Sequence, residues 1–484
     1  MLGCDGTNNR PPDAQEGMNG MKKLGFNPYL PSWEYIPDGE PYVFGDRVYV
    51  YGSHDLFNGW VFCMGDYVCW SAPVDDLTDW RYEGIIYPRN EDPMNKDGSM
   101  CLYAPDVTVG PDGRYYLYYV LDHLDIVAVA VCDTPAGRYQ FYGNVHYEDG
   151  TLYGRKEGDE PQFDPGVLTE GDTTYLYTGF CARGDKSRHG AMLVELGPDM
   201  LTIRGEKRFV APGVEYAEGT GYEGHAFFEA PSIRKHGDTY YFVYSSTPMH
   251  ELCYATSKDP RQGFTYGGVI VSNCDLHIGD EPDLPKAYGG NNHGSIIEIN
   301  GQWYIFYHRQ TNRSWYSRQG CLEPIQILPD GSIPQVEMTS CGPNGGPLPG
   351  KGEYPAYIAC HLFDKERHMI TGAPNSAYVT QDGKDGDEID GHIANIHDGT
   401  VIGFKYFDFD DVSKVTLMIR GYGWGGTLHV KTSKFGPSLA SMKLENTNIW
   451  TAFSAPITLP KGKSPLYITY EGGGSIMLKS VIFE

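Results

Sequence analysis

The sequence lacks any long apolar run. No stretch of about 20 apolar residues occurs in the 484 residues, so we expect no membrane-spanning helix. The N-terminus also lacks the apolar centre of a signal peptide, which predicts a cytoplasmic protein. Residues 1–23 end in a second Met-Lys-Lys start, and we expect them to form a flexible leader.

Paired cysteines and an excess of positive charge are missing as well. The eleven cysteines are scattered, without a Cys-x-x-Cys pair, which indicates reduced thiols and neither a disulfide framework nor a zinc site. Lys and Arg number 38 against 63 Asp and Glu, giving a formal net charge of −25. We therefore expect no nucleic acid and no membrane as partner, because both require a basic face. A neutral substrate such as a carbohydrate suits this charge.

The chain does contain a pattern of strand, tight turn and Tyr-rich strand that occurs five times between residues 24 and 342. The high content of Tyr (37), Gly (61) and Pro (33) predicts an all-β protein. Equivalent positions lie 68, 58, 65 and 64 residues apart, which fits four-stranded sheets set radially as a five-bladed β-propeller. The copies are DGEPYVFGDRVYVYGS, PDVTVGPDGRYYLYYV, DPGVLTEGDTTYLYTG, EAPSIRKHGDTYYFVYSS and HGSIIEINGQWYIFYHR.

An ionisable residue opens each copy: Asp38, Asp106, Asp164, Glu229 and His293. The innermost strands of a propeller line its axis, so these side chains should meet there. Carboxyl groups packed together cannot all ionise, which separates an acid from a base at one pH. Each Asp could instead cap its own turn. The apolar surroundings of Glu229 suit a general acid.

Three motifs resemble glycoside hydrolase family 43. They are PDGE at 37–40, YAPDV at 103–107 and EAPS at 229–232, and the resemblance covers roughly residues 26 to 340. The family commonly has Pro where Gly39 stands and Trp where Tyr103 stands. Neither departure removes a catalytic group, but both leave the substrate preference open.

The resemblance implies a five-bladed propeller and an inverting glycosidase. Asp38 is then the general base that activates water, and Glu229 is the general acid that protonates the leaving oxygen. Asp106 is expected to orient Glu229 and to hold its pKa up. In an inverting enzyme the acid and the base lie about 6.5–9.5 Å apart, which leaves room for the water.

Further residues are expected around this centre. His293 matches a family position on the axis, where it either faces a water-shelled calcium ion or is solvated without an ion; no other cofactor is expected. Arg309 is predicted either to bind substrate hydroxyls or to pair with an axial carboxylate. Tyr103 and Phe228 are predicted to stack on a sugar, and Asp164 to act as a hydrogen-bonding group of the axis or pocket.

The repeat stops at a Gly- and Pro-rich segment, 343–350, which we interpret as a linker. Residues 351–484 contain regularly spaced short strands that predict a β-sandwich. This segment loosely resembles a family 6-like carbohydrate-binding module. Trp450 is either a sugar platform or a core residue. The domain could bind carbohydrate, brace the propeller or help to form a homo-oligomer.

These observations together favour an exo-acting glycosidase. It would remove β-D-xylose or α-L-arabinofuranose from plant-derived oligosaccharides. An endo-acting arabinanase or xylanase-type enzyme is the second interpretation. A non-catalytic carbohydrate-binding propeller is the third, and it predicts that Asp38, Asp106 or Glu229 is replaced, whereas all three are present.

Overall fold

The computed structural model describes residues 24–367 and 376–484, so the leader predicted at 1–23 lies outside the described residues. The described chain is built from strands and four single-turn 3₁₀ helices, which confirms the all-β prediction. Its helices are single turns, too short to span a membrane. The four 3₁₀ helices are η1 (Arg89–Glu91), η2 (Val214–Tyr216), η3 (Gly342–Asn344) and η4 (Ala356–Ile358).

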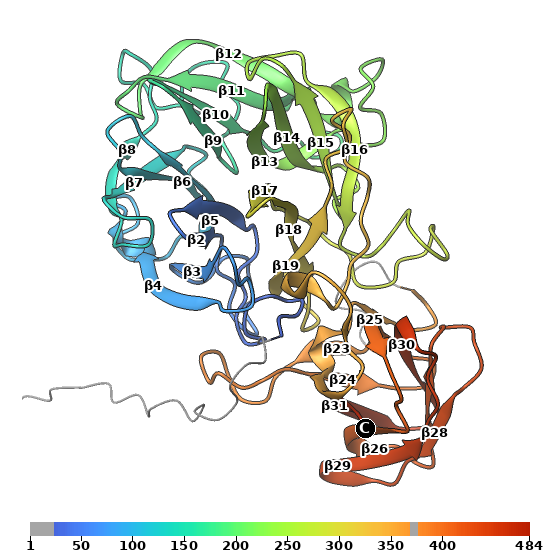
Figure 1. Ribbon diagram of the computed structural model, residues 1–484. Helices are drawn as coiled ribbons and strands as arrows, with labels where there is room; N and C mark the ends of the chain where they lie inside the picture. Colours follow the sequence, from blue (N-terminus) through green and yellow to red (C-terminus); the bar gives the residue numbers. More distant parts are fainter. Residues whose placement is uncertain (1–23, 368–375) are drawn as a thin grey trace, which may run out of the picture.

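The first domain consists of five successive antiparallel sheets arranged around a central axis (Figure 1). Within each sheet the strands are hydrogen-bonded in chain order, as the turn signals of the five repeats predict. The strands are β1 (Glu40–Phe44), β2 (Arg47–Tyr51), β3 (Tyr67–Pro73) and β4 (Arg81–Tyr87); β5 (Leu102–Val109), β6 (Tyr115–Leu121), β7 (Ala128–Cys132) and β8 (Gln140–Asn144); β9 (Gly166–Glu170), β10 (Thr173–Thr178), β11 (Gly190–Leu196) and β12 (Ile203–Pro212); β13 (Phe227–His236), β14 (Thr239–Ser246), β15 (Glu251–Ser257) and β16 (Thr265–Ser272); and β17 (Ile296–Ile299), β18 (Gln302–Gln310) and β19 (Arg318–Ile325).

The innermost strands are the first of each sheet: β1, β5, β9, β13 and β17. The ring is closed between its first and last sheets, where Gly39 and Gly294 form a parallel bridge. Gly294 has no room for a side chain, because a Cβ atom there would overlap the carbonyl oxygen of Phe306. The glycine after the axial histidine thus lets the segment that leads into β17 lie close against β18 of its own sheet.

Tyrosine side chains fill the wedges between neighbouring sheets. Tyr51, Tyr118 and Tyr177 are buried, and each hydroxyl donates a hydrogen bond to a backbone carbonyl, those of Pro135, Met200 and Pro260 at 2.6–2.7 Å. A buried tyrosine combines a large apolar ring with a satisfied polar tip, so it can pack between two sheets and also hold a loop. This explains the Tyr-rich second strand of every repeat.

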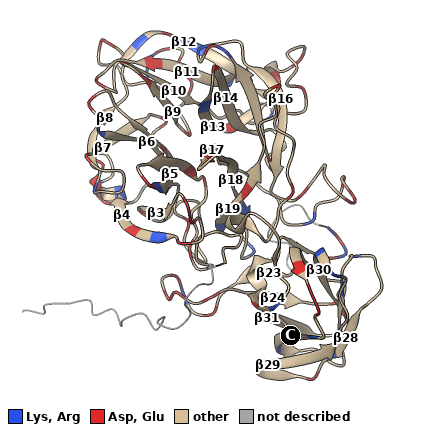
Figure 2. Ribbon diagram, viewed as in Figure 1, with Lys and Arg blue, Asp and Glu red and all other residues tan. Residues whose placement is uncertain are grey.

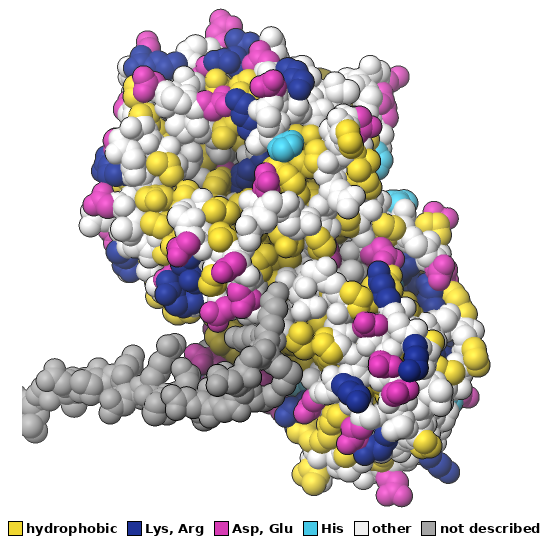
Figure 3. All heavy atoms as spheres, viewed as in Figure 1, with side chains coloured by type: hydrophobic (Ala, Val, Ile, Leu, Met, Phe, Trp, Pro, Cys, Tyr) yellow, Lys and Arg dark blue, Asp and Glu magenta, His cyan; other side chains and the backbone are white. Residues whose placement is uncertain are grey.

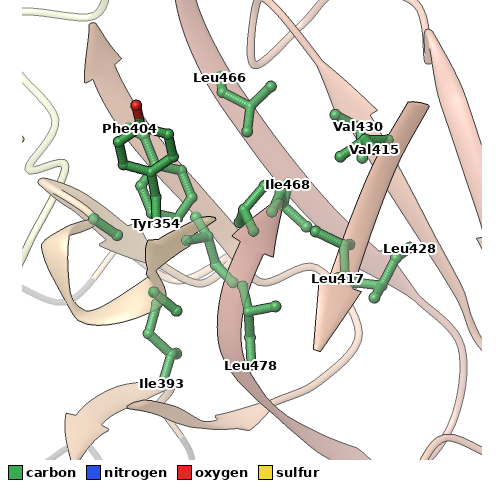
Figure 4. Packing of buried hydrophobic residues seen from close by; sticks show 14 of the residues in the cluster. Tyr354, Ile393, Phe404, Val415, Leu417, Leu428, Val430, Leu466, Ile468 and Leu478 are labelled. Carbon is green, nitrogen blue, oxygen red and sulfur yellow. The ribbon is translucent and has the colours of Figure 1, made fainter. Parts of the chain in front are cut away.

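The second domain is a β-sandwich of two six-stranded sheets (Figure 1). Apolar side chains from the two sheets form its core, shown in Figure 4. One sheet contains β20 (Leu348–Pro349), β22 (His361–Phe363), β25 (Val401–Phe409), β27 (Thr427–Lys431), β28 (Ala440–Lys443) and β30 (Gly462–Glu471); the other contains β21 (Gly352–Pro355), β23 (Tyr378–Thr380), β24 (His392–Ile396), β26 (Lys414–Tyr422), β29 (Thr447–Pro456) and β31 (Ser475–Phe483).

The segment 343–350 is not a free linker, which corrects the sequence interpretation. Its residues Leu348 and Pro349 form β20, which pairs in parallel with β25. Leu348 is fully buried in the sandwich core. The Gly and Pro content of this segment therefore shapes a packed turn into the second domain.

The two domains are joined through several hydrogen bonds. The Phe57 backbone N–H donates to Asp385 at 2.8 Å, and the Asn312 N–H donates to the Val379 carbonyl at 2.8 Å. Asn312 also donates through Nδ2 to Asn58 at 2.9 Å. The sandwich thus supports a loop of the first sheet.

Acidic and basic residues are spread over both domains (Figure 2), and the face in Figure 3 mixes both signs. The ten described cysteines are free thiols.

Candidate active site

A cavity of about 330 Å³ lies at the end of the axis where the inner strands begin. Four of the five repeated ionisable residues, Asp38, Asp164, Glu229 and His293, line it, and all four are buried. The cavity thus gathers residues from four different sheets. Its remaining lining residues are Phe62, Tyr103, Val120, Leu121, Asp122, His123, Asp125, Phe163, Phe180, Asn291 and Arg318.

Asp38 is held in the ionised form. Burial opposes its charge, but the guanidinium of Arg318 and the imidazole of His293 outweigh burial and keep its pKa below the usual range. Arg318 Nη1 donates to Asp38 Oδ1 at 3.0 Å. The Asp38 backbone has φ of 57°, a strained left-handed conformation that the fold must enforce. Its N–H donates to Nδ1 of His308 at 3.3 Å.

His308 serves this site as a neutral acceptor. Burial lowers its pKa to about 3, so the ring carries one proton at neutral pH. Nε2 lies 2.7 Å from the carbonyl oxygen of Asn291 and donates to it. Nδ1 is then the unprotonated nitrogen and accepts the N–H of Asp38. The histidine thereby fixes the backbone that carries the carboxylate.

Arg318 connects two buried aspartates. Its Nε and Nη2 donate to the two oxygens of Asp55 at 2.8 and 3.0 Å, while Nη1 reaches Asp38. Its guanidinium also lies 4.7 Å from the centre of the Phe62 ring. A bidentate pair of this kind fixes the guanidinium in orientation as well as in charge. Arg318 therefore positions Asp38 and one wall of the cavity together.

Glu229 and Asp164 form a pair of neighbouring carboxyl groups. Burial and the charge of Asp164 raise the pKa of Glu229 to about 8. Burial also raises the pKa of Asp164 to about 7, with His293 opposing and Asp38 adding to the shift. The N–H of Ala230, the residue after Glu229, donates to Asp164 Oδ2 at 3.2 Å. Glu229 is thus protonated at neutral pH beside an ionised Asp38.

His293 lies among three carboxylates. Its Nδ1 is 3.9 Å from Asp38 and 3.8 Å from Asp164, and its Nε2 is 3.7 Å from Glu40. Burial disfavours its charge, but Glu40, Asp164 and Asp38 raise its pKa to about 9. An imidazolium at this place supplies positive charge to the floor of the cavity.

Asp106 does not lie beside Glu229, which corrects the role predicted for it. It is the fifth residue of β5, inside the strand, and it does not line the cavity. Its carboxylate accepts hydrogen bonds from the Tyr42 hydroxyl at 2.6 Å and the Val167 N–H at 2.7 Å. Burial and Glu40 raise its pKa to about 7. The residue that contacts the Glu229 segment is Asp164, which precedes β9 by two positions.

Of the other residues predicted to bind substrate, some line the cavity and some do not. Tyr103 lines the cavity, with its ring 5.5 Å from that of Phe163. Phe228 packs against Phe180, with ring centres 5.0 Å apart, and does not itself line the cavity. Arg309 is buried away from the cavity and donates to the Ala359 carbonyl at 2.9 Å. The prediction that Arg309 contacts substrate or an axial carboxylate is therefore wrong.

Sequence reasoning missed Arg318, His308 and Glu40. Strand alternation could have found His308. Side chains of adjacent strand residues point to opposite faces. Because Arg309 points away from Asp38, its neighbour His308 points toward it. Glu40 carries no such signal, because Asp38 lies before β1 with φ of 57° and interrupts the alternation. Arg318 carries a weaker signal, a single cation within an otherwise buried strand.

The cavity therefore holds an ionised and a protonated carboxyl group, the equipment of acid–base hydrolysis. This site and the propeller that carries it define a glycosidase of the propeller class. Residues 37–333 match the family model of the glycosyl hydrolases family 43. The chain belongs to glycosyl hydrolase family 43 and is an O-glycosyl hydrolase.

Several relatives support this membership. The chain is 65% identical over 468 residues to a xylosidase/arabinosidase of Thermoclostridium stercorarium, covering 95% of this chain and 99% of that protein. A xylosidase/arabinosidase of Bacteroides ovatus is 30% identical, with 64% of this chain and 97% of that protein covered.

Solved structures are similar in fold. A family 43 enzyme from Xanthomonas citri complexed with xylose has a TM-score of 0.51 and 26% identity, covering 64% of this chain and 92% of that chain. An arabinoxylan arabinofuranohydrolase from Bacillus subtilis, in complex with cellotetraose, has a TM-score of 0.50 and 19% identity. It covers 94% of this chain and 97% of its own, so the likeness in fold includes the second domain.

Replacing Arg318 by Gln is expected to destabilise the chain, because Asp38 and Asp55 would lose their shared cation. Removing one partner of a buried ion pair costs about 3–5 kcal/mol in the free energy of unfolding. Arg114→Gln is the matched control, because Arg114 pairs with Asp112 on the surface and such pairs contribute about 0–1 kcal/mol. Urea unfolding followed by Trp fluorescence measures both. Equal losses in the two variants would contradict the proposed importance of Arg318.

Proposed function

We propose that the chain is an inverting, exo-acting enzyme that removes β-D-xylose and α-L-arabinofuranose from plant-derived oligosaccharides. The proposal rests on two carboxyl groups in one cavity, Asp38 and Glu229, whose pKa values are shifted in opposite directions. The xylosidase/arabinosidase of T. stercorarium supports the choice of sugars. A 25% identical X. citri structure complexed with xylotriose supports the oligosaccharide. The cavity, at about 330 Å³, is at the small end of ligand pockets, which favours exo over endo action.

The proposed reaction is a single displacement. Asp38 accepts a proton from a water molecule as that water attacks the anomeric carbon. Glu229 gives its proton to the glycosidic oxygen as the bond to the anomeric carbon breaks. The products are an inverted sugar and the shortened oligosaccharide, and the reaction leaves Asp38 protonated and Glu229 ionised. Asp164 takes the positioning role first expected of Asp106, because it raises the pKa of Glu229.

We also propose that a hydrated calcium ion binds near His293. Glu40 Oε1 is buried without a hydrogen-bond partner in the described part of the chain and lies 3.7 Å from His293 Nε2. A carboxylate oxygen left unsatisfied suits the water shell of a calcium ion, since calcium prefers oxygen ligands. Glu40 therefore fits the ion, and calcium would replace the proton that otherwise keeps His293 charged, because an imidazolium repels a second cation. Metal analysis of the chain and of His293→Ala tests it: calcium retained equally by both would exclude His293 as its holder.

The role of the second domain also stays a proposal. Trp450 is packed, not a free platform, because Arg420 lies 4.4 Å from its ring centre and His392 packs edge-on at 5.3 Å. We propose that the domain braces the propeller through Asp385 and Val379. Carbohydrate binding by this domain, a homo-oligomer and a cytoplasmic location remain predictions, to be tested by polysaccharide binding, light scattering and cell fractionation.

Glu229→Gln is expected to lower kcat by about 10²- to 10⁴-fold on xylo-oligosaccharides, because the leaving oxygen loses its proton donor. The loss should be much smaller on dinitrophenyl β-xyloside, whose leaving group needs no protonation. Glu223→Gln is the control, an exposed Glu of the same segment. Steady-state rates on β-xylosides and α-arabinofuranosides measure both variants.

Two results would contradict this assignment. A Glu229→Gln loss that is the same for good and poor leaving groups would exclude Glu229 as the acid. Proton NMR of the first-formed sugar should show the inverted anomer, and a retained anomer would exclude the single displacement. A wild-type chain that cleaves none of these glycosides would favour the carbohydrate-binding interpretation.

Asp164→Asn is expected to move the alkaline limb of the kcat/KM profile to lower pH. The negative charge of Asp164 helps to raise the pKa of Glu229 to about 8, so its removal lets Glu229 ionise at lower pH. The protonated, active form is then lost earlier as the pH rises. Asp122→Asn, at another acid of the cavity wall, should leave the limb in place. An unmoved limb in Asp164→Asn would refute the positioning role.

A further inference from the structure

A second group of ionisable side chains lies in the fourth sheet, apart from the residues that line the cavity. It consists of His250 and Glu251, where β15 begins, and His277, in the loop that follows β16. One potential ligand atom from each residue lies within 4.8 Å of the others. We propose that His250, Glu251 and His277 bind a divalent zinc ion that ties this loop to the sheet.

Glu251 supplies the main argument. Its Oε1 accepts hydrogen bonds from His225 Nδ1 at 2.6 Å and from Ser246 Oγ at 2.5 Å. Its Oε2 is buried and has no hydrogen-bond partner in the described part of the chain. A buried carboxylate oxygen without a partner is costly. A cation held between this carboxylate and the two histidines would satisfy it.

The His250 ring is held in place through one of its two nitrogens. Ser272 Oγ lies 3.0 Å from His250 Nδ1 and orients the ring, as a polar neighbour of a metal-binding histidine does. Nε2 has no hydrogen bond to the described residues.

His277 is the exposed member of the group. Its ring centre is 6.1 Å from that of His250, and its backbone N–H donates to the Pro282 carbonyl at 2.7 Å. An exposed ring gives an ion access and can move the short distance that closes a coordination sphere. Two imidazoles, one carboxylate and a water form the four-coordinate set that zinc accepts.

An alternative set shares Glu251 but is less suitable. His225, Glu251 and Cys253 also lie within 4.8 Å of one another. Cys253 Sγ donates to Glu251 Oε1 at 3.5 Å, an oxygen that already accepts hydrogen bonds from His225 and Ser246 and is not the unpartnered Oε2. His225 Nδ1 is already bonded to Glu251. The ion is therefore assigned to the side of His250 and His277. The sequence predicted no zinc site because cysteine pairs are missing. That criterion does not apply to ligands that are histidine and glutamate.

Such an ion would stabilise the segment that leads to the axial histidine. The His250 carbonyl accepts the Asn273 N–H at 2.8 Å and Asn292 Nδ2 at 3.3 Å. Asn292 Oδ1 in turn accepts the His308 N–H at 3.2 Å. None of His250, Glu251 and His277 lines the cavity, so the proposed role is structural. The proposal does not depend on which sugar the enzyme cleaves.

Zinc titration of the full-length, metal-depleted chain tests the proposal. Isothermal titration calorimetry should show one zinc ion per chain, and scanning calorimetry should show a Tm that rises with zinc, because an ion that binds only the folded state stabilises it. His277→Ala should weaken zinc binding at least about tenfold, the loss of one good ligand interaction. Its Tm without zinc should match that of the wild type, because the side chain is exposed.

His236→Ala is the matched control, since His236 is an exposed histidine at the far end of β13 in the same sheet. It should bind zinc as the wild type does. Calcium should change the Tm of the wild type and of His277→Ala by the same amount, because calcium prefers oxygen ligands to histidine. A wild type that binds no zinc would overturn the proposal. Unchanged zinc affinity in His277→Ala would overturn it equally.

Discussion

The carboxyl groups buried on the propeller axis outnumber the cations beside them. The protonation of the whole site depends on this imbalance. Asp38, Glu40, Asp106, Asp164 and Glu229 are all buried there, and the cations beside them are Arg234, Arg318 and His293. Charges this close cannot all be carried in a buried site, so some of the acids must keep their protons. Asp38 and Glu40, which contact the arginines directly, are ionised. Glu229, without such a contact, keeps its proton.

This charge balance requires a rigid frame, because a carboxyl group that reached water would lose its shifted pKa. The propeller supplies the frame by burying each acid at the start of an inner strand or within one. Ring closure at Gly39 and Gly294 fixes the first and last sheets. The sandwich then holds the loop of Phe57 through Asp385, and this loop leads to Phe62 in the cavity wall. The second domain is thus mechanically connected to the site.

The sequence alone predicted the fold class and the axial gathering, because hairpin signals and Tyr-rich strands report local structure. It failed where one or a few residues decide the outcome. Asp106 and Asp164 hold equivalent repeat positions, but Asp106 lies inside β5, where the pairing with β6 is irregular, and Asp164 lies before β9. A shift of a few residues along a strand moves a side chain from the cavity to the interior of the axis. The prediction for Arg309 failed because adjacent residues of a strand point to opposite faces, and His308 is the one that faces Asp38.

The chemistry and the specificity of the site come from different parts of the fold. The acid and the base lie at the inner strands, where burial and charge fix their protonation. The aromatic walls, formed by Phe62, Tyr103 and Phe163, belong largely to the segments that connect strands and sheets. Loops tolerate substitution better than inner strands do. Changes in the walls can therefore alter which pentose fits without disturbing the proton balance, and a single catalytic frame can accept both β-xylosides and α-arabinofuranosides.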